Sequence, residues 1–337
     1  MEIGPAKRLP RLNPFVFPSN TDFQFVLLIL TLIGAIIFIY NELYLSLGNN
    51  RDIRKLMHEQ CLKTNELPLA LGDYEKMYIR NTNYIHCVAG FERARILWIF
   101  AGLSFVSITA SLIYLWSPKW KILHDHLESL NPEDAPEVVT YTLSLCSEIN
   151  LSRNPTLLWN PTNFAISGVA FGRLGQYYLS LTAGLVKQFY DAHNRPRFRA
   201  IVLHELAHLQ NADIDKTYFA VAIWLAFAIN IFIILPLILL NERADIILGW
   251  SWRALALILM VYLLRNAVLR SRELYADVRA SVWNADVEVL ISIVETHPRH
   301  DNIFQTLRSV HPNRAERLEV LAEPHRLLLN FGGWDFF

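Results

Sequence analysis

Two histidines and a glutamate stand at the spacing of a metal site in the segment AIVLHELAHLQNADID. His204 and His208 are four residues apart, so on a helix they project from one face, one turn apart along the axis. Two imidazoles in this arrangement can bind one metal ion. Glu205 flanks them and is placed to take a proton from water at the metal rather than to bind the metal itself. This HExxH pattern predicts a zinc site with Glu205 as the general base.

A bland alternative is a pair of ordinary helix histidines packed in a core. The neighbours Ile201, Val202, Leu203, Leu206 and Ala207 are apolar, which predicts a largely buried helix. Burying two imidazoles and a carboxylate without partners is costly, and a bound metal removes that cost. We therefore favour the metal site.

Catalytic zinc needs three protein ligands and one open position for water. Glu273, in the segment SRELYADVRA, is the candidate for the third ligand, although taken alone it could be a surface charge. Asp277 follows one helical turn later and could accept the outer N–H of a ligand histidine, as could Asp213 from the first helix. The expected cofactor is one Zn²⁺ per chain.

Four apolar segments surround these residues, at 23–40, 96–116, 218–240 and 246–264. A helix crosses a bilayer with about 20 mostly apolar residues, so we expect four transmembrane helices. The fourth contains Arg253, and its alternative is a buried or interfacial amphipathic helix. The polar regions left over are an N-terminal segment 1–22, an inter-span segment 41–95, a turn at 241–245, and two parts of a catalytic domain at 117–217 and 268–337.

The first part of the catalytic domain changes its apolar period along the chain. Residues 134–150 and 196–212 are predicted to be helices. Residues 163–171 and 176–182 are rich in β-branched and aromatic side chains, and the stretch 172–175 joins them. This pattern predicts a β-hairpin immediately before the HExxH helix.

Three motifs resemble the HtpX and CAAX-prenyl-protease family of membrane zinc metallopeptidases: HELAHLQNAD at 204–213, SRELYAD at 271–277 and HPNRAER at 311–317. The order of two spans, HExxH domain, two spans and glutamate helix is similar to HtpX. The larger CAAX proteases have more spans. The resemblance implies an α-helical membrane protein with four transmembrane helices and an α+β zincin-like metallopeptidase domain, made of a small β-hairpin or sheet beside the HExxH helix.

The resemblance also implies roles for individual residues. His204, His208 and Glu273 would bind zinc, and Glu205 would activate water. His311 and Arg317 match the family's HP-x4-R pattern, whose histidine and arginine lie near the transition-state oxyanion, although HP alone could simply begin a helix. Where the family's substrate-binding edge strand usually reads Asn-Ala-Phe-Ala, this chain has Asn163, Phe164 and Ala165.

A membrane-embedded zinc endopeptidase acting on protein or peptide substrates is thus the favoured function. The alternative is a zinc-binding membrane sensor or receptor whose protease domain cleaves itself or one regulatory partner. Retention of Glu205, which a pure binding module would not need, favours catalysis. A transporter is less favoured because the ligands flank the apolar segments rather than interrupting them.

Composition and charge bound the partners. Of the 337 residues, 53% are hydrophobic, which favours a lipid bilayer as a partner. The formal net charge is zero, so nothing favours nucleic acid, which would need a basic face. The three cysteines form no zinc or disulfide framework, and we expect reduced thiols. Basic residues before the first apolar segment and around the end of the fourth favour a cytosolic catalytic side, whereas eight in 41–95 argue against it. The sequence does not indicate the oligomeric state.

Overall fold

The computed structural model describes residues 21–47, 73–210, 213–241, 244–283, 287–295 and 311–322. Its helices are α1 (Thr21–Leu47), α3 (Asp73–His124), α4 (Pro136–Glu148), α5 (Ala183–Tyr190), α6 (Arg195–Gln210), α7 (Asp213–Asn241), α8 (Ala244–Val282), α9 (Val287–Glu295) and α11 (Arg314–Ala322). The chain divides into two compact units. One is built from 1–28, 111–222 and 262–337, and the other from 29–110 and 223–261.

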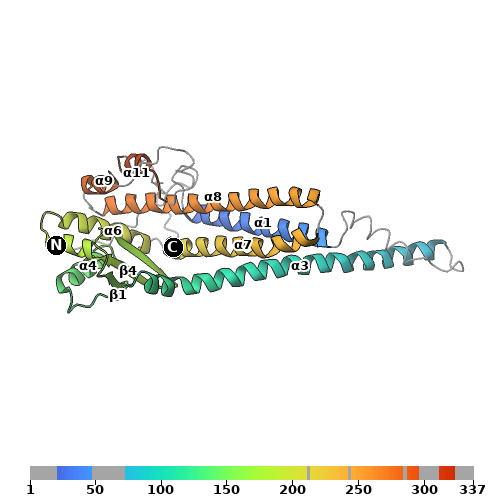
Figure 1. Cartoon of the computed structure of the whole chain (residues 1–337), viewed down its shortest axis with the longest axis horizontal. Coiled ribbons are helices and arrows are strands. Elements are labelled where there is room, and N and C mark those ends of the chain that lie inside the picture. Colours follow the sequence, from blue (N-terminus) through green and yellow to red (C-terminus); the bar gives the residue numbers. More distant parts are fainter. Residues whose placement is uncertain are drawn as a thin grey trace. The chain divides into compact units, whose positions relative to one another are not determined.

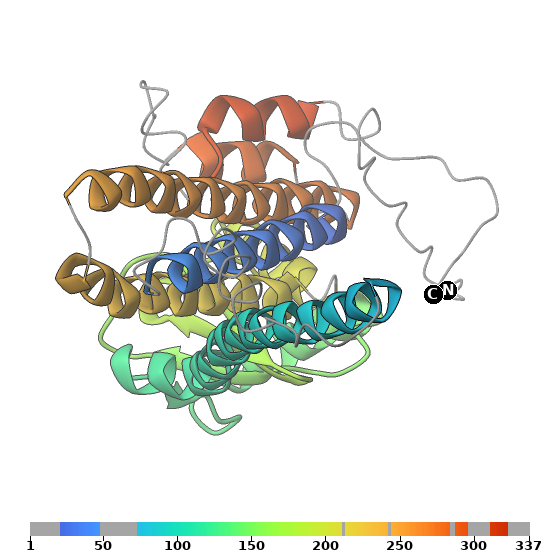
Figure 2. The same cartoon turned by 90° about the vertical axis from the view of Figure 1, so that its right-hand side faces the viewer.

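The second unit contains one end of each of the four long helices, namely 29–47 of α1, 73–110 of α3, 223–241 of α7 and 244–261 of α8 (Figure 2). In α1, Tyr40 donates a buried 2.9 Å hydrogen bond to Asn230 of α7, and its ring meets Trp98 of α3 edge to face. Glu42 of α1 lies 3.5 Å from Arg253 of α8. The arginine in the fourth apolar segment is therefore paired with a carboxylate, which lowers the cost of placing it in an apolar helix.

Among the described residues, four helices are long and apolar enough to cross a membrane: Asp22–Tyr44, Ile85–His124, Asp213–Ile234 and Ser251–Val282. The predicted membrane-protein fold class is confirmed, but the predicted boundary at residue 268 is not a structural break. Helix α8 continues from its apolar part to Val282 and carries Glu273. No glycine or proline interrupts residues 265–282, so nothing in the sequence ends the helix there.

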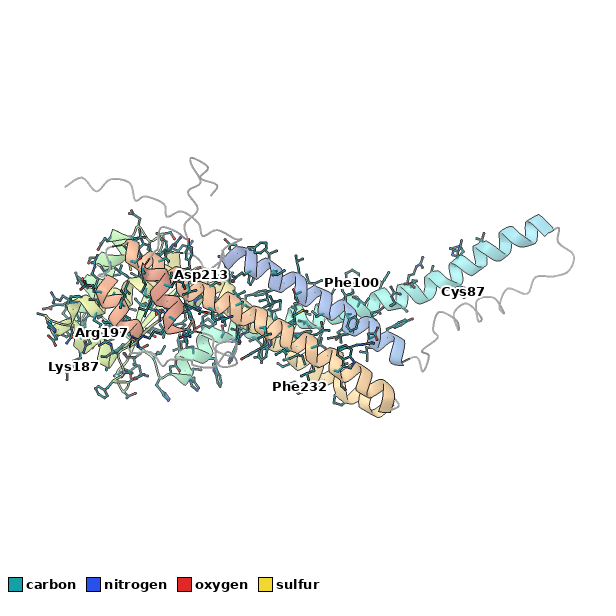
Figure 3. The ribbon with its side chains drawn as sticks, turned by 90° about the horizontal axis from the view of Figure 1, so that it is seen from above. Cys87, Phe100, Lys187, Arg197, Asp213 and Phe232 are labelled. Atoms are coloured by element: carbon teal, nitrogen blue, oxygen red, sulfur yellow. The ribbon has the colours of Figure 1, made fainter. Side chains whose placement is uncertain are left out.

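The inter-span segment is helical at both of its described ends, in α1 and α3. The expectation of three reduced thiols is wrong for Cys87, which lies on α3 (Figure 3) and is disulfide-bonded. An odd number of cysteines excludes a full framework of bridges but not a single bridge. Cys146 is free and buried. Residues 1–20 of the N-terminal segment and residues 242–243 of the predicted 241–245 turn lie outside the described residues.

A four-stranded sheet lies in the first unit (Figure 1). Its strands are β1 (Glu128–Ser129), β2 (Thr156–Asn160), β3 (Gly168–Arg173) and β4 (Gln176–Thr182), in the spatial order β1-β2-β4-β3. β2 and β4 are parallel, and the other two pairings are antiparallel. The predicted hairpin is confirmed as β3 and β4, and β3 forms an edge of this sheet.

The hairpin differs from the prediction at its start, because Asn163, Phe164 and Ala165 precede β3 rather than belonging to it. Asn160 Oδ1 accepts hydrogen bonds from the backbone N–H of Thr162 and Asn163, and Asn163 Oδ1 accepts one from Ala165. Side-chain acceptors of this kind stabilise a turn in competition with a strand. The alternating pattern alone did not reveal this turn.

Helix α6 packs against β3, α5 and α9, and the predicted helices 134–150 and 196–212 correspond to α4 and α6. The core of this unit contains Leu179 and Leu181 of β4 together with Phe198, Val202 and Leu206 of α6. The apolar face of α6 thus packs against apolar side chains of the sheet and neighbouring helices. Its HExxH residues lie along β3 on one side and α8 on the other.

Candidate metal centre

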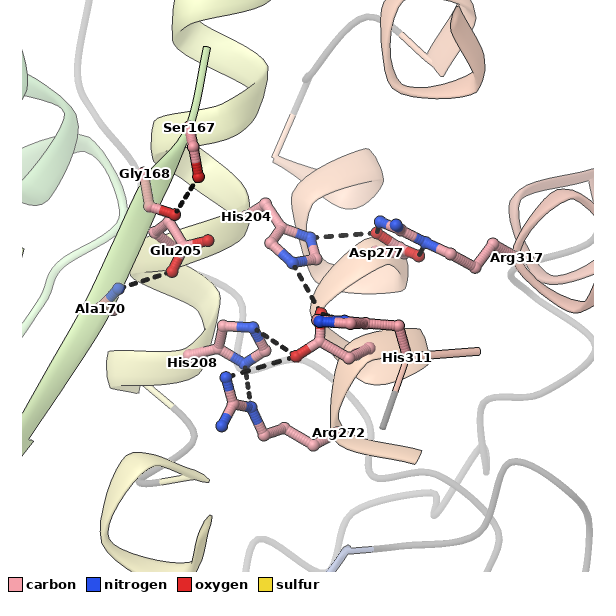
Figure 4. Close-up of polar contacts among 11 residues, drawn as sticks. Ser167, Gly168, Ala170, His204, Glu205, His208, Arg272, Asp277, His311 and Arg317 are labelled. Carbon is pink, nitrogen blue, oxygen red and sulfur yellow. Dashed lines mark hydrogen bonds and ion pairs between the residues drawn. The ribbon is translucent and has the colours of Figure 1, made fainter. Parts of the chain in front are cut away.

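Three side chains from two helices converge in the first unit (Figure 4). Their ligand atoms, one each from His204, His208 and Glu273, all lie within 4.8 Å of one another. His204 Nε2 is 3.6 Å from Glu273 Oε2, and His208 Nε2 is 3.5 Å from Glu273 Oε1. His208 is buried, and the side chains of His204 and Glu273 are each 12% exposed. The structure therefore brings together the three ligands expected from the sequence.

The donor set and its spacing fit a zinc ion. Two ligands that bind zinc tetrahedrally at about 2.0–2.1 Å stand about 3.4 Å apart. The two histidine-to-glutamate distances of 3.6 and 3.5 Å are close to this value. Two imidazoles and one carboxylate are also the protein ligands of a familiar class of catalytic zinc site.

The outer nitrogen of His204 faces an anion. Its Nδ1 is 3.0 Å from Asp277 Oδ1, and Asp277 is fully buried. Arg317 holds this carboxylate with two hydrogen bonds of 2.6 Å, from Nε and Nη2. Burial opposes the charged imidazole, but Asp277 and Glu273 outweigh it and raise the pKa of His204 to about 10. A carboxylate at Nδ1 favours a proton on that atom and leaves Nε2 for a metal.

The outer nitrogen of His208 faces a cation instead. Arg272 donates from Nε to His208 Nδ1 over 3.3 Å, and its Nη2 lies 3.3 Å from Glu273 Oε1. Burial, followed by the charge of Arg272, holds the pKa of His208 well below its usual value, so this imidazole is neutral. A histidine that binds metal through Nε2 carries its proton on Nδ1 and cannot accept there. This contact must therefore change when a metal binds.

Glu205 lies between the histidines and the edge strand of the sheet. The backbone N–H of Ala170, in β3, donates a 2.7 Å hydrogen bond to Glu205 Oε2. Burial raises the pKa of the Glu205 carboxyl above its usual value, although the neighbouring charge of His204 and the Ala170 bond oppose the rise. A carboxyl with a raised pKa is a stronger base when ionised, which suits a proton acceptor.

His311 lies beside Glu273, whereas Arg317 lies beside Asp277. His311 is exposed, and its Nδ1 is 3.6 Å from Glu273 Oε2. Arg317 is buried, and its Nε and Nη2 both donate to Asp277. Through Asp277, Arg317 is linked to His204. The oxyanion role expected from the resemblance remains a prediction for both His311 and Arg317.

The remaining predicted site residues are Asp213 and residues 163–165. Asp213 is buried at the first turn of α7, 3.7 Å from Lys216. Phe164 is 76% exposed in the turn before β3, and the substrate role of residues 163–165 remains a prediction. The sequence reading missed Arg272 as part of the site. Its signal was available, since it directly precedes the proposed ligand Glu273.

Comparison with known proteins bears on the same segment. The family model described as peptidase family M48 matches residues 160–325, which include β3, β4, α6, α8 and the HPNRAER motif. No curated protein and no solved structure matches the chain. The match spans every residue of the His204, His208 and Glu273 cluster as well as Glu205. Over these residues the chain belongs to peptidase family M48, the metallopeptidase family that contains HtpX and the CAAX prenyl proteases.

Proposed function

We propose that the chain is a membrane-embedded endopeptidase that hydrolyses peptide bonds with a zinc ion held by His204, His208 and Glu273. Metallopeptidases of family M48 are zinc-dependent. The observation that carries the proposal is the convergence of three ligand atoms within 4.8 Å, with Glu205 beside them on the same helix. Zinc bound there would supply a Lewis acid that polarises a carbonyl and lowers the pKa of water.

Glu205 performs the proton transfers in this mechanism. Its carboxylate takes a proton from the attacking water and then delivers it to the leaving amine. The Ala170 N–H holds one carboxylate oxygen, which leaves the other oxygen available for the proton. His311, exposed beside Glu273, is the residue that would donate toward the oxyanion.

The position of β3 at the edge of the sheet supports extended binding of the substrate. β3 is an edge strand, and an extended peptide can add to such an edge through backbone hydrogen bonds. This mode supplies affinity with little sequence preference. The N–H of Ala170 contacts Glu205, so a peptide added along β3 would lie beside the general base.

The test compares Glu205→Gln with Glu273→Gln in the full-length protein in lipid bilayers. Glu205→Gln keeps the shape of the side chain but removes the proton acceptor, so zinc should stay bound while cleavage of a casein-like or self-derived substrate falls by about 10²–10⁴-fold. Glu273→Gln weakens a ligand, so zinc content and cleavage should fall together. Glu148→Gln, at an exposed position on α4, is the matched control and should change neither.

One result would overturn this mechanism, and another would change the function. Wild-type cleavage by Glu205→Gln would remove Glu205 as the base. A wild-type chain that binds zinc but cleaves no general substrate, and acts only on itself or one partner, would favour the sensor function. Zinc stoichiometry measured beside cleavage separates these outcomes.

We also propose that the catalytic side is cytosolic. Helix α3 carries the disulfide-bonded Cys87 toward one end and leads into the catalytic domain at His124. Disulfides persist in oxidising compartments, so the Cys87 side is the non-cytosolic one if α3 crosses the membrane. This outweighs the basic residues of segment 41–95, which is long enough for the charge rule to weaken. Cysteine labelling should place residues 200 and 311 on one face and residue 243 on the other.

A further inference from the structure

The turn of the β3–β4 hairpin has a leucine where a polar or glycine residue would be easier to accommodate. Arg173 pairs with Gln176, so Leu174 and Gly175 form a two-residue turn. Both have positive φ, 45° and 81°, a conformation that favours glycine, asparagine and aspartate. The Leu174 side chain is also 72% exposed. An exposed apolar side chain in an unfavourable backbone conformation is easier to explain if it contacts another apolar surface.

The carboxylate of Asp215, in the first turn of α7, fixes the position of this tip. Asp215 Oδ1 accepts hydrogen bonds from the Leu174 N–H at 2.9 Å and from the Tyr114 hydroxyl at 2.6 Å. Asp215 Oδ2 accepts one from the Tyr177 hydroxyl at 2.6 Å. We call these contacts the Asp215 clasp. They join the hairpin to α3 and α7, two helices that are apolar enough to cross a membrane.

The clasp lies at the level where two apolar segments end. Tyr114 belongs to the apolar segment 96–116, and Asp215 shortly precedes the apolar segment 218–240. Further along α3, Lys121 Nζ lies 5.6 Å from the centroid of the Phe171 ring in β3. Tyr114 and Lys121 are about 10 Å apart along the helix, and Phe171 and Leu174 about 10 Å apart along the strand. β3 therefore runs beside α3, with its tip toward the apolar segment.

The surface of α3 at this level is typical of a membrane interface. Trp116 and Trp120 are 61% and 60% exposed, and Lys119 is exposed between them. Tryptophans are enriched where a helix passes from hydrocarbon to water, and lysines extend to the headgroups there. Arg173, beside Leu174, supplies a basic side chain on the hairpin itself.

We propose that the tip of the β3–β4 hairpin contacts the lipid bilayer, with Leu174 inserted at the boundary between headgroups and acyl chains. The Asp215 clasp holds the tip at that depth. Ala170 is four residues before Leu174, about 13 Å along an extended strand. Lipid contact at the tip would thus fix the orientation of β3 relative to the membrane surface, and with it the position of Ala170 beside Glu205. This contact requires neither zinc nor catalysis and is tested separately from them.

The test places a spin label at position 174 in the full-length protein in lipid nanodiscs. The label on Leu174→Cys should be more accessible to oxygen, which concentrates in lipid, than to a water-soluble nickel chelate. Phe164→Cys is the matched control, because it is equally exposed and lies beyond the other end of β3, so its label should prefer the nickel chelate. The unlabelled-site background is measured on the chain without either substitution.

Each possible result decides the proposal. Equal preference for nickel at both positions would overturn lipid contact. A label at 174 that is shielded from both reagents would also overturn it, because it would indicate a protein partner at the tip. Asp215→Asn removes the charge that gathers the three donors, and should reduce the oxygen preference at 174. An unchanged preference would overturn the role of the clasp. Leu174→Trp, read by quenching with brominated lipids, gives an independent measure if the cysteine variant folds poorly.

Discussion

The two histidines of the HExxH helix meet the same carboxylate on their inner side but opposite charges on their outer side. His204 Nδ1 faces Asp277, which Arg317 holds by two hydrogen bonds. His208 Nδ1 accepts instead from Arg272. One ligand is therefore already arranged for a metal, and the other must exchange a contact before it can bind through Nε2. His204 and His208 thus differ in how much must change before each can bind a metal. The reason is that Asp277 and Arg272, which contact their Nδ1 atoms, lie on different turns of α8.

Arg272 is the cation on the outer side of His208. Its guanidinium contacts both His208 and Glu273. Without a metal ion, it therefore supplies the positive charge beside these two proposed ligands. Zinc brings two positive charges to the same ligands, and like charges repel at short range. Arg272 should thus oppose metal binding, whereas Asp277 should favour it.

The largest effect is expected from removing either ligand. His204→Ala and His208→Ala should each lose the zinc that the wild-type protein in detergent holds at about one ion per chain, because a catalytic site with two protein ligands binds zinc weakly. Metal analysis of the purified variants checks this. Full zinc retention in the double variant would remove the site altogether, and with it the comparison of its two sides.

The next effect separates the two outer partners. Asp277→Asn removes the anion at His204, and zinc affinity should fall by about 10–100-fold, as is typical when such a partner is lost. Arg272→Gln removes the cation at His208, and zinc affinity should stay unchanged or rise. Both are measured by competition with a zinc chelator of known affinity.

Arg272→Lys is the control for this pair, since it keeps the charge without the guanidinium fork. It should bind zinc like the wild type or slightly more tightly. If Arg272→Gln lost zinc as strongly as Asp277→Asn, the two sides would be equivalent, and Arg272 would be an organiser of the site rather than a competitor of the metal.

Much of the metal site could be predicted from the sequence, because helical spacing places His204, Glu205 and His208 whatever surrounds the helix. Glu273 required a guess about which distant carboxylate approaches. Asp277 then followed from the one-turn spacing on the same helix. Arg317 was recognised as part of a motif, but its contact with Asp277 was not predicted, because a sequence pattern does not say which nearby anion a guanidinium contacts.

Helices and strands were predicted well where the spacing of apolar residues determines the secondary structure. They were predicted less well where side-chain hydrogen bonds determine it. The apolar segments and the α6 helix followed from composition and period. The start of β3 did not, because the oxygens of Asn160 and Asn163 hold a turn there. β2 pairs in parallel with β4, a contact between residues separated along the chain that no local pattern indicates.

A smaller effect concerns protons. Without metal, His204 has a pKa raised to about 10 and is protonated near pH 8, whereas the lowered pKa of His208 leaves it already neutral. Zinc must displace the proton on His204, so binding near pH 6, where water on zinc with a pKa of about 7 keeps its protons, should release about one proton, and affinity should rise with pH until about pH 10. Calorimetry in buffers of different ionisation enthalpy measures the number. Release of two protons would show that His208 is also charged, contrary to the role given to Arg272.

The smallest effect on zinc affinity is expected from Arg317→Lys, which keeps the positive charge but removes the guanidinium group. Arg317→Lys leaves a cation beside the buried Asp277 but replaces two hydrogen bonds with a single contact. Asp277 should remain ionised and His204 should remain oriented, so zinc affinity should fall only a few-fold.

Arg199→Lys is the matched control for Arg317→Lys, since Arg199 pairs with Glu148 at an exposed position where an ion pair contributes about 0–1 kcal/mol. It should leave zinc affinity unchanged. Arg317→Ala should be far more damaging than Arg317→Lys, because removing one partner of a buried pair costs about 3–5 kcal/mol. Chelator competition and thermal unfolding of the three variants distinguish the charge of Arg317 from its geometry. If Arg317→Lys behaved like Arg317→Ala, the two-point contact with Asp277, rather than the charge, would be what prepares His204 for the metal.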